Sequence, residues 1–451
     1  MSPQAAQAAL AALAALAAQG ANALPEGPHH ACRVHHAIGA RRTLAGGLLA
    51  LAAALLSACG GGGSSTGGSG SNDNVQSIQV GADLNGNFVN IVTTSVTICV
   101  PGTSNCQTIP NVHVDTGSTG LRLLASAVRL GLPTVAGSSG SRLHSCTAFA
   151  DGVTWGPLAA ADVRLGNQTS ATVSIQLIKD GSDGAALPAD CADKGTVQDS
   201  VALLGSNGVL GVGVFQEDCG STCVGTPVGL YYACTAAGAC SDSVVALATQ
   251  IRNPVAALAA HNNGVLLQLP AIPATGAASA TGNLIFGIGT SSNNVLGGTP
   301  ITVPASGARA GYFTASYNGR TLANSFIDSG SSVHFVDDAS IPACTGNLAD
   351  WYCPGSANAL SALTFNVTLT GSNGASTTTS FSIANTQYLF SQPGSAGLWA
   401  FNNLGAPAGG TFGASLDLGL PFFFGKTVFT AIEQRSTPYG TGPYFAFQAY
   451  P

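Results

Sequence analysis

Two short stretches of the chain carry the residues most able to do chemistry. In each, an apolar run typical of a β-strand ends in an aspartate, which is followed by a small hydroxyl residue, a glycine and a serine. The first stretch is Asp115-Thr116-Gly117-Ser118 and the second is Asp328-Ser329-Gly330-Ser331. A strand that delivers a carboxylate onto a tight glycine turn, with hydroxyls on either side, can hold that acid rigidly.

Two carboxyl groups about 3 Å apart cannot both ionise, so they share one proton, and one acts as a base while the other acts as an acid. Such a pair can activate a water molecule for hydrolysis. The alternative is that Asp115 and Asp328 each belong to an Asx or Ser/Thr turn at a strand end, which is common in Gly-rich β proteins. We favour the chemical interpretation because the sequence that follows each motif repeats as well.

The repeat is an apolar segment that ends in glycine. Asp115 is followed by Val209-Leu210-Gly211, and Asp328 is followed at nearly the same separation by Leu418-Gly419. Motifs that recur in the same order and spacing indicate an internal duplication. A run as rich in glycine as residues 207–213 also indicates that another backbone passes close by.

With these motifs, the chain resembles the pepsin-like aspartic peptidases over most of residues 77–451. That family has two lobes, each with an Asp-[Thr/Ser]-Gly-[Ser/Thr] motif and a later apolar segment that crosses beneath it. The resemblance implies an all-β, bilobal fold of two related β-barrel-like lobes with a cleft between them. The N-terminal lobe would span residues 76–275 and hold Asp115, and the C-terminal lobe would span residues 276–451 and hold Asp328.

The same resemblance implies that Asp115 and Asp328 are the catalytic pair. The residues that directly follow the two acids would interlock their hydroxyls beneath the pair. The serines that end the motifs would hydrogen-bond the outer carboxylate oxygens and favour the charged form. These supporting residues are Thr116, Gly117, Ser118, Ser329, Gly330 and Ser331.

A hairpin at residues 148–156, with its turn at Asp151-Gly152, falls where the family has its substrate-covering flap. The family usually places a tyrosine and a tryptophan in this region, and the matching positions here are Phe149 and Arg122. The family's hydrogen-bond network is therefore missing, and we expect the flap to close differently. Asp417 stands where the family has an apolar residue, and such a buried acid needs a partner or stays protonated.

The composition limits the classes of function. Hydrophobic residues make up 45% of the chain and charged residues only 8%, so a large core is expected beneath a surface of uncharged polar residues. The net charge of −6 leaves no basic patch, which argues against a nucleic-acid partner. We expect a monomer that needs no cofactor. His113 and His334 flank the two motifs, and we interpret them as buried or rim histidines.

The N-terminal region predicts an exported protein. Arg41-Arg42 precede an apolar run that ends in Leu56-Ser57-Ala58-Cys59, and a Gly/Ser-rich stretch follows. This arrangement resembles a bacterial lipoprotein signal, which implies a leader at residues 1–58, lipidation of Cys59 and a flexible tether at residues 59–75. A buried core helix is the alternative, and it fits poorly before such a tether. The protein would then be lipid-anchored on the periplasmic or cell-surface side of the envelope.

The cysteines agree with export. Of twelve, Cys32 lies in the leader and Cys59 would carry lipid, which leaves ten, a number that suits five disulfides. A metal site is the competing interpretation, but no Cys-x-x-Cys pair with partnered histidines occurs. We expect Cys99 to pair with Cys106, Cys344 with Cys353 and, by elimination, Cys146 with Cys191. The remaining four, for which three pairings stay open, are Cys219, Cys223, Cys234 and Cys240.

The sequence thus predicts an aspartic-type endopeptidase that hydrolyses a peptide or protein held in an extended form. The alternative is a lipoprotein that binds a peptide or glycan on the same scaffold without cutting it. The likeness also extends to bacterial lipoproteins that are known only as an uncharacterised domain family.

Overall fold

The computed structural model describes residues 73–451 except 138–139, 183 and 410–413. This part of the chain is predominantly β-structure, so the predicted all-β class is confirmed. No helix within it is long and apolar enough to cross a membrane. The predicted leader, Cys59 and the tether up to residue 72 lie outside the described residues.

Strands of the first half include the hairpin predicted at residues 148–156. They are β1 (Val75–Gly81), β2 (Ile91–Cys99), β3 (Cys106–Asp115), β4 (Thr119–Leu124), β5 (Arg142–Phe149), β6 (Gly152–Leu165), β7 (Gln168–Thr169), β8 (Val173–Ile178), β9 (Gly208–Val212), β10 (Tyr231–Cys234) and β11 (Cys240–Asp242). The helices between residues 189 and 391 are short. They are α2 (Ala189–Ala192), α3 (Val201–Leu204), α4 (Thr222–Gly225) and α5 (Thr386–Ser391).

Strands of the second half follow the same mixture of long hairpins and short central strands. They are β12 (Gly264–Leu269), β13 (Ala280–Phe286), β14 (Ile301–Thr302), β15 (Phe313–Tyr317), β16 (Arg320–Ile327), β17 (His334–Val336), β18 (Ala362–Thr370), β19 (Ser376–Ala384), β20 (Gly405–Ala406), β21 (Leu416–Leu418), β22 (Lys426–Ala431), β23 (Ser436–Thr437), β24 (Gly440–Thr441) and β25 (Tyr444–Ala449).

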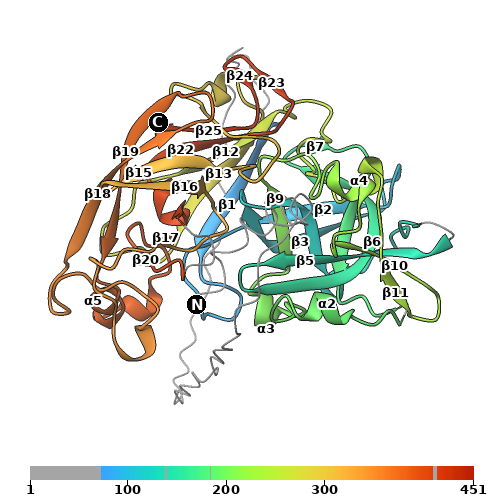
Figure 1. The fold of residues 1–451 in the computed structure, drawn as a ribbon, viewed down its shortest axis with the longest axis horizontal. Coiled ribbons are helices and arrows are strands. Elements are labelled where there is room, and N and C mark those ends of the chain that lie inside the picture. The colour runs from blue at the N-terminus through green and yellow to red at the C-terminus, as the bar shows by residue number, and fades with distance from the viewer. Residues whose placement is uncertain (1–72, 138–139, 183, 410–413) are drawn as a thin grey trace, which may run out of the picture. The chain divides into compact units, whose positions relative to one another are not determined.

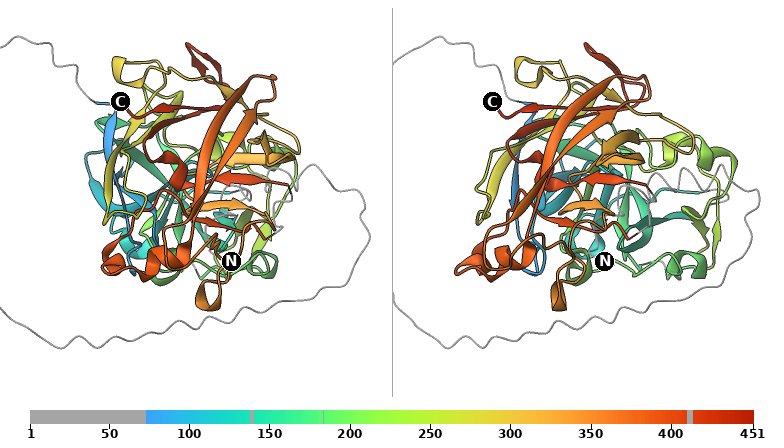
Figure 2. Two further views of the ribbon diagram at one scale, coloured as in Figure 1. Left: turned by 90° about the vertical axis from the view of Figure 1, so that its left-hand side faces the viewer. Right: turned by 60° about the vertical axis from the view of Figure 1, so that its left-hand side comes forward.

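One sheet of 16 strands and one of 7 strands make up most of the molecule. The larger sheet runs from β11 through the first-half strands to β1, and continues through β13, β12, β22 and β25 to β14. Figure 1 shows β1, in blue, beside β13, in yellow, where the two strands pair antiparallel. The smaller sheet contains β15 to β21, and its β18–β19 hairpin is the long orange one in Figure 2. The chain's two halves are therefore joined by backbone hydrogen bonds.

The strands that end in the two aspartates have equivalent neighbours. β3 pairs in parallel with β9, which places Asp115 opposite Gly211, and β9 pairs antiparallel with β4. In the second half, β16 pairs in parallel with β21, which places Ile327 opposite Leu418, and β21 pairs antiparallel with β17. The local arrangement around each acid is thus repeated, as the duplicated motifs predict.

Five disulfides staple the fold, and the three predicted pairings are confirmed. The Cys99–Cys106 bond closes the β2–β3 hairpin, so it stiffens the strand that delivers the first aspartate. The pairing left open by the sequence is resolved as two local bridges. The five bonds are Cys99–Cys106, Cys146–Cys191, Cys219–Cys223, Cys234–Cys240 and Cys344–Cys353.

Candidate active site

The structure brings Asp115 and Asp328 together, although they are far apart in the sequence. Their carboxyl groups converge on the same residue, Gly330, and both side chains are fully buried. A Cβ atom added to Gly330 would lie 2.6 Å from Oδ1 of Asp115 and 3.1 Å from Oδ1 of Asp328. Glycine suits this position because a side chain would collide with the carboxyl group of Asp115 and crowd that of Asp328.

Reciprocal hydrogen bonds hold the two motifs together beneath the acids. The backbone N–H of Thr116 donates to Oγ of Ser329 at 3.1 Å, and the backbone N–H of Ser329 donates to Oγ1 of Thr116 at 2.9 Å. The Ser329 hydroxyl also donates to the carbonyl of Val114 at 2.9 Å. Each motif thus supplies a hydroxyl that satisfies the other's backbone, which matches the interlock expected for Thr116 and Ser329.

Backbone and hydroxyl donors orient each carboxylate. Oδ1 of Asp115 accepts the N–H groups of Gly117 at 2.8 Å and Ser118 at 3.1 Å. Oδ1 of Asp328 accepts the N–H of Gly330 at 2.7 Å, and its Oδ2 accepts the Ser331 hydroxyl at 2.9 Å. The turn that follows each strand is therefore closed on its own acid.

The expectation for Ser331 is met, but the expectation for Ser118 is wrong. The Ser118 hydroxyl makes no hydrogen bond to any described residue, and Oδ2 of Asp115 receives no donor from them. The Ser118 hydroxyl lies on the side of the crossing strand, where a Cβ on Gly211 would be 2.8 Å from its Oγ. This hydroxyl therefore packs against Gly211, and only the Ser118 backbone N–H supports Asp115.

The crossing segments approach so closely that only glycine fits. A Cβ on Gly211 would also lie 2.7 Å from the backbone nitrogen of Thr119. In the second half, a Cβ on Gly419 would lie 2.0 Å from the carbonyl oxygen of Val333 and 2.8 Å from that of Ser331. The close passage predicted from the Gly-rich sequence is confirmed at both places.

Burial and neighbouring acids favour a protonated form in this site. The pKa of Asp328 is raised well above its usual range by burial, by the negative charge of Asp115 and by that of Asp417. Asp417 lies on β21, and the hydroxyl of Ser331 contacts its Oδ2 at 2.5 Å. Burial raises the pKa of Asp417 well above its usual range too. Burial and neighbouring negative charge therefore both favour the protonated forms of Asp328 and Asp417.

The β5–β6 hairpin lies where the flap is expected, and Phe149 at its tip is buried. The Arg122 guanidinium lies over the Phe149 ring at 5.8 Å from the ring centroid. This guanidinium also donates to Thr147 at 3.1 Å and forms a buried ion pair with Asp218 at 3.0 Å. The Tyr231 hydroxyl donates to the same aspartate. A buried polar network centred on Arg122 thus lies against Phe149.

Asp218 was not among the residues predicted from the sequence. Burial raises its pKa to about 6, although the positive charge of Arg122 lowers it. Asp218 precedes Cys219 in the segment that follows β9, and no local pattern in the sequence links it to Arg122. Only the tertiary structure brings this acid to Arg122, next to the β5–β6 hairpin.

The turn of the flap carries a further acid, Asp151, which the sequence analysis assigned only to the turn. The Gln198 amide donates to Oδ2 of Asp151 at 2.7 Å, and the Gln198 backbone N–H donates to Val153 at 2.8 Å. Val153 forms a parallel bridge with Val197. Burial raises the pKa of Asp151 to about 8, and the negative charge of Asp115 adds to the shift. The flap turn is thus fastened to residues 196–198 and lies near the aspartate pair.

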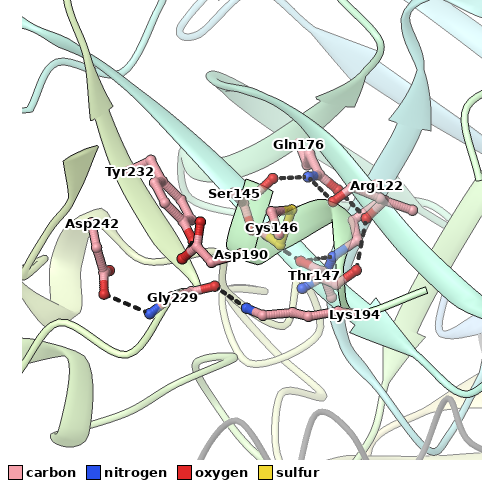
Figure 3. Close-up of a disulfide and its surroundings, with 12 residues drawn as sticks. Arg122, Ser145, Cys146, Thr147, Gln176, Asp190, Lys194, Gly229, Tyr232 and Asp242 are labelled. Carbon is pink, nitrogen blue, oxygen red and sulfur yellow. Dashed lines mark hydrogen bonds between the residues drawn. A yellow bond between two sulfur atoms is a disulfide. The ribbon is translucent and has the colours of Figure 1, made fainter. Parts of the chain in front are cut away.

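The middle of the hairpin is fastened as well. The Cys146–Cys191 disulfide, shown in Figure 3, joins β5 to α2. Beside it, the Lys194 side chain donates to the carbonyl of Gly229, and the Tyr232 hydroxyl donates to Asp190. On the other side of the disulfide, the Gln176 amide donates to the carbonyl of Ser145 at 2.7 Å. The β5–β6 hairpin is therefore fastened both at its middle and at its turn.

The two histidines near the motifs are buried. Burial lowers the pKa of His113, and the negative charge of Asp115 opposes this effect. Burial, followed by the positive charge of Lys426, lowers the pKa of His334 to about 3. Among the described residues, no three His, Cys, Asp or Glu side chains are placed to hold a metal ion.

An apolar pocket lies directly beside Thr116 and Gly117. Its walls come from both halves of the chain, so its shape depends on their contact. The large side chains that line it are Val214, Phe215, Tyr312, Phe326, Ile327 and Phe445.

These features define an all-β, disulfide-stapled protein in which two repeated motifs bring a pair of buried aspartates together. The chain belongs to the family described as "Protein of unknown function (DUF3443)", whose model matches residues 70–447. No curated protein matches the chain.

Proposed function

We propose that this protein is an aspartic-type endopeptidase with the bilobal fold of the pepsin-like enzymes. The observation that carries the proposal is the convergence of Asp115 and Asp328 on Gly330, at the ends of strands with equivalent neighbours and above the reciprocal bonds of Thr116 and Ser329. Turn capping alone would not require the two turns to meet. The repeated arrangement also supports an origin by duplication of one lobe.

The proposed reaction is hydrolysis of a peptide bond. One carboxylate of the pair takes a proton from a water molecule as the water oxygen attacks the carbonyl carbon, and the protonated carboxyl donates to the carbonyl oxygen. The C–N bond then breaks, and a proton passes to the leaving amine. The N–H groups of Gly117 and Gly330 hold the carboxyl groups in place throughout.

The substrate would be an extended peptide, held by backbone hydrogen bonds and covered by the flap. The apolar pocket beside Thr116 and Gly117 suits an apolar side chain next to the cleaved bond. Because Asp115 and Asp328 are fully buried in this structure, the flap must open before a peptide can reach them. The five disulfides support export, and lipidation at Cys59 would anchor the mature protein to the bacterial envelope.

The test is cleavage of a peptide library by the purified protein at acidic pH. We expect cleavage that a statine-type transition-state mimic blocks, and we expect Asp115→Asn to lower kcat/KM by about a thousandfold. Asp193→Asn changes an exposed acid in the same way and serves as the matched control. Cleavage by Asp115→Asn at the wild-type rate would exclude the proposed mechanism.

A second candidate is a protein that binds a peptide or glycan without cutting it. It is favoured by the buried state of the acids and by the fastening of the flap at its turn and its middle. Binding of a peptide library without cleavage at any pH, with equal affinity for wild type and Asp115→Asn, would support this candidate and exclude the peptidase.

A further inference from the structure

The third buried acid, Asp417, is joined to the aspartate pair through a single hydroxyl. In the parallel pairing of β16 with β21, Asp417 lies opposite Phe326, two residues before Asp328. Alternate residues of a strand point to the same face, so both acids project toward Ser331. Oγ of Ser331 lies 2.9 Å from Oδ2 of Asp328 and 2.5 Å from Oδ2 of Asp417.

The single hydroxyl proton of Ser331 determines the direction of its hydrogen bonds with the two acids. A serine hydroxyl has one proton, so Ser331 can donate to only one of the two carboxyl oxygens. In the other contact, Oγ of Ser331 meets a carboxyl oxygen without donating to it, so the carboxyl group must supply the proton of that hydrogen bond. One of the two acids must therefore be protonated and donate to Oγ of Ser331.

The surroundings identify Asp417 as the donor. The carboxylate of Asp328 is supported by the N–H of Gly330 at 2.7 Å, whereas Oδ1 of Asp417 is buried and receives no hydrogen bond from any described residue. An ionised carboxylate with one unsupported buried oxygen is costly. Three titratable groups interact electrostatically with Asp417 in the described part of the chain, and none of them is a cation. They are Asp115, Asp328 and Tyr312. Burial raises the pKa of both Asp417 and Asp328, so the unequal hydrogen bonding of the two carboxyl groups is what distinguishes them.

We propose that Asp417 is a positioning residue: its protonated carboxyl donates to Oγ of Ser331 and thereby commits the Ser331 proton to Oδ2 of Asp328. The hydroxyl then supports the ionised form of the pair in a fixed direction. An ionised Asp417 would instead draw the Ser331 proton away from Asp328 and add a second negative charge to the site. The effect on catalysis rests on the proposed peptidase activity, but the direction of the hydrogen bonds does not.

Two substitutions separate this role from the alternatives. Asp417→Asn keeps the shape of a protonated acid, and its amide N–H can donate to Ser331. Asp417→Leu has nearly the same size and cannot donate. We expect Asp417→Asn to retain the wild-type pH profile of kcat/KM, and Asp417→Leu to lower kcat/KM about tenfold, with its acid limb moved toward higher pH.

Infrared spectroscopy of the whole protein gives a readout that does not need activity. The spectrum of wild type at pH 7 should contain the carbonyl band of a protonated carboxyl group that is missing from Asp417→Asn. This band supports the proposal even if no peptide is cleaved, so failure of the peptidase assignment can be distinguished from failure of the inference. If Asp417→Leu does not fold, the infrared comparison decides alone.

Three results would overturn the proposal. The first is a carboxylate band, in place of the acid band, that Asp417→Asn removes at pH 7. The second is a loss of activity in Asp417→Asn as large as in Asp417→Leu, because an ionised Asp417 would then be required. The third is an unchanged pH profile in folded, active Asp417→Leu, which would reduce Asp417 to a residue that fills space.

Discussion

Replacing Arg122 by methionine tests the network beneath the flap. The substitution keeps much of the side-chain volume but removes the charge that faces Asp218 at 3.0 Å and the donor to Thr147. Both members of the ion pair are buried, so the variant leaves an acid in the core without its cation. Loss of one member of a buried pair costs about 4 kcal/mol of the free energy of unfolding at pH 7.

The cost should depend on pH in a predictable direction. The folded-state pKa of Asp218 is about 6 and its unfolded value is 3.8, so wild type loses stability as pH rises from about 4 to 6. Without Arg122 the folded-state pKa rises further, and stability keeps falling up to pH 7. Arg122→Met should therefore cost about 1.4 kcal/mol more at pH 7 than at pH 4 for each unit of added shift.

The assay is urea unfolding of the oxidised protein at both pH values, followed by fluorescence. Arg129→Met removes an exposed arginine and should change the unfolding free energy by less than about 0.5 kcal/mol. In an Asp218→Asn background, Arg122→Met should cost about 2 kcal/mol less than in wild type, because no ionisable group is left unpaired. A cost under about 1 kcal/mol, or equal costs at pH 4 and pH 7, would refute the assigned role of the ion pair.

Three further predictions concern the fastening of the site. Asp151→Asn should raise the unfolding free energy by about 2 kcal/mol at pH 7 and change it little at pH 4. The folded-state pKa of Asp151 is about 8 and its unfolded value is 3.8, so folding is penalised only at pH values above the unfolded pKa. Equal effects in the denaturation curves at the two pH values would contradict this. Gly419→Ala should lower the free energy of urea unfolding by about 3 kcal/mol, because its Cβ would lie 2.0 Å from a carbonyl oxygen. Gly131 lies in open space, so Gly131→Ala should leave the unfolding free energy unchanged. Similar losses in the two variants would argue against close passage. Replacing both Cys146 and Cys191 by serine opens a loop with a sequence separation of 45, which should lower the unfolding free energy by about 4 kcal/mol. Hydrogen exchange should then become faster in β5 than elsewhere. Uniformly faster exchange would show that the disulfide does not hold the hairpin.

The parts of the site that could be predicted from the sequence are those encoded in local patterns. An aspartate at a strand end and a glycine in a crossing segment each leave a signature of a few residues, so the surroundings of Asp115 and Gly211 were predictable. The Cys99–Cys106 bond was predictable for the same reason, because it closes a short turn.

The remaining parts depend on contacts between distant segments. Nothing near Asp218 indicates that it faces Arg122, and Asp151 has the ordinary sequence of a turn residue. The Ser118 hydroxyl was assigned to Asp115 by its place in the motif, but the strand that crosses beside it decides its orientation. A pattern thus predicts which residues lie in the site, and packing decides which atoms of those residues take part.

The position of β1 affects how the protein would respond to force. Its antiparallel ladders with β2 and β13 occupy both edges of the strand, so its removal would expose unpaired backbone on two neighbours at once. A pull along β1 from its N-terminal end would load these hydrogen bonds together in shear, instead of opening them one after another. A protein held at that end by a surface could therefore bear mechanical load through its central strand without first unravelling.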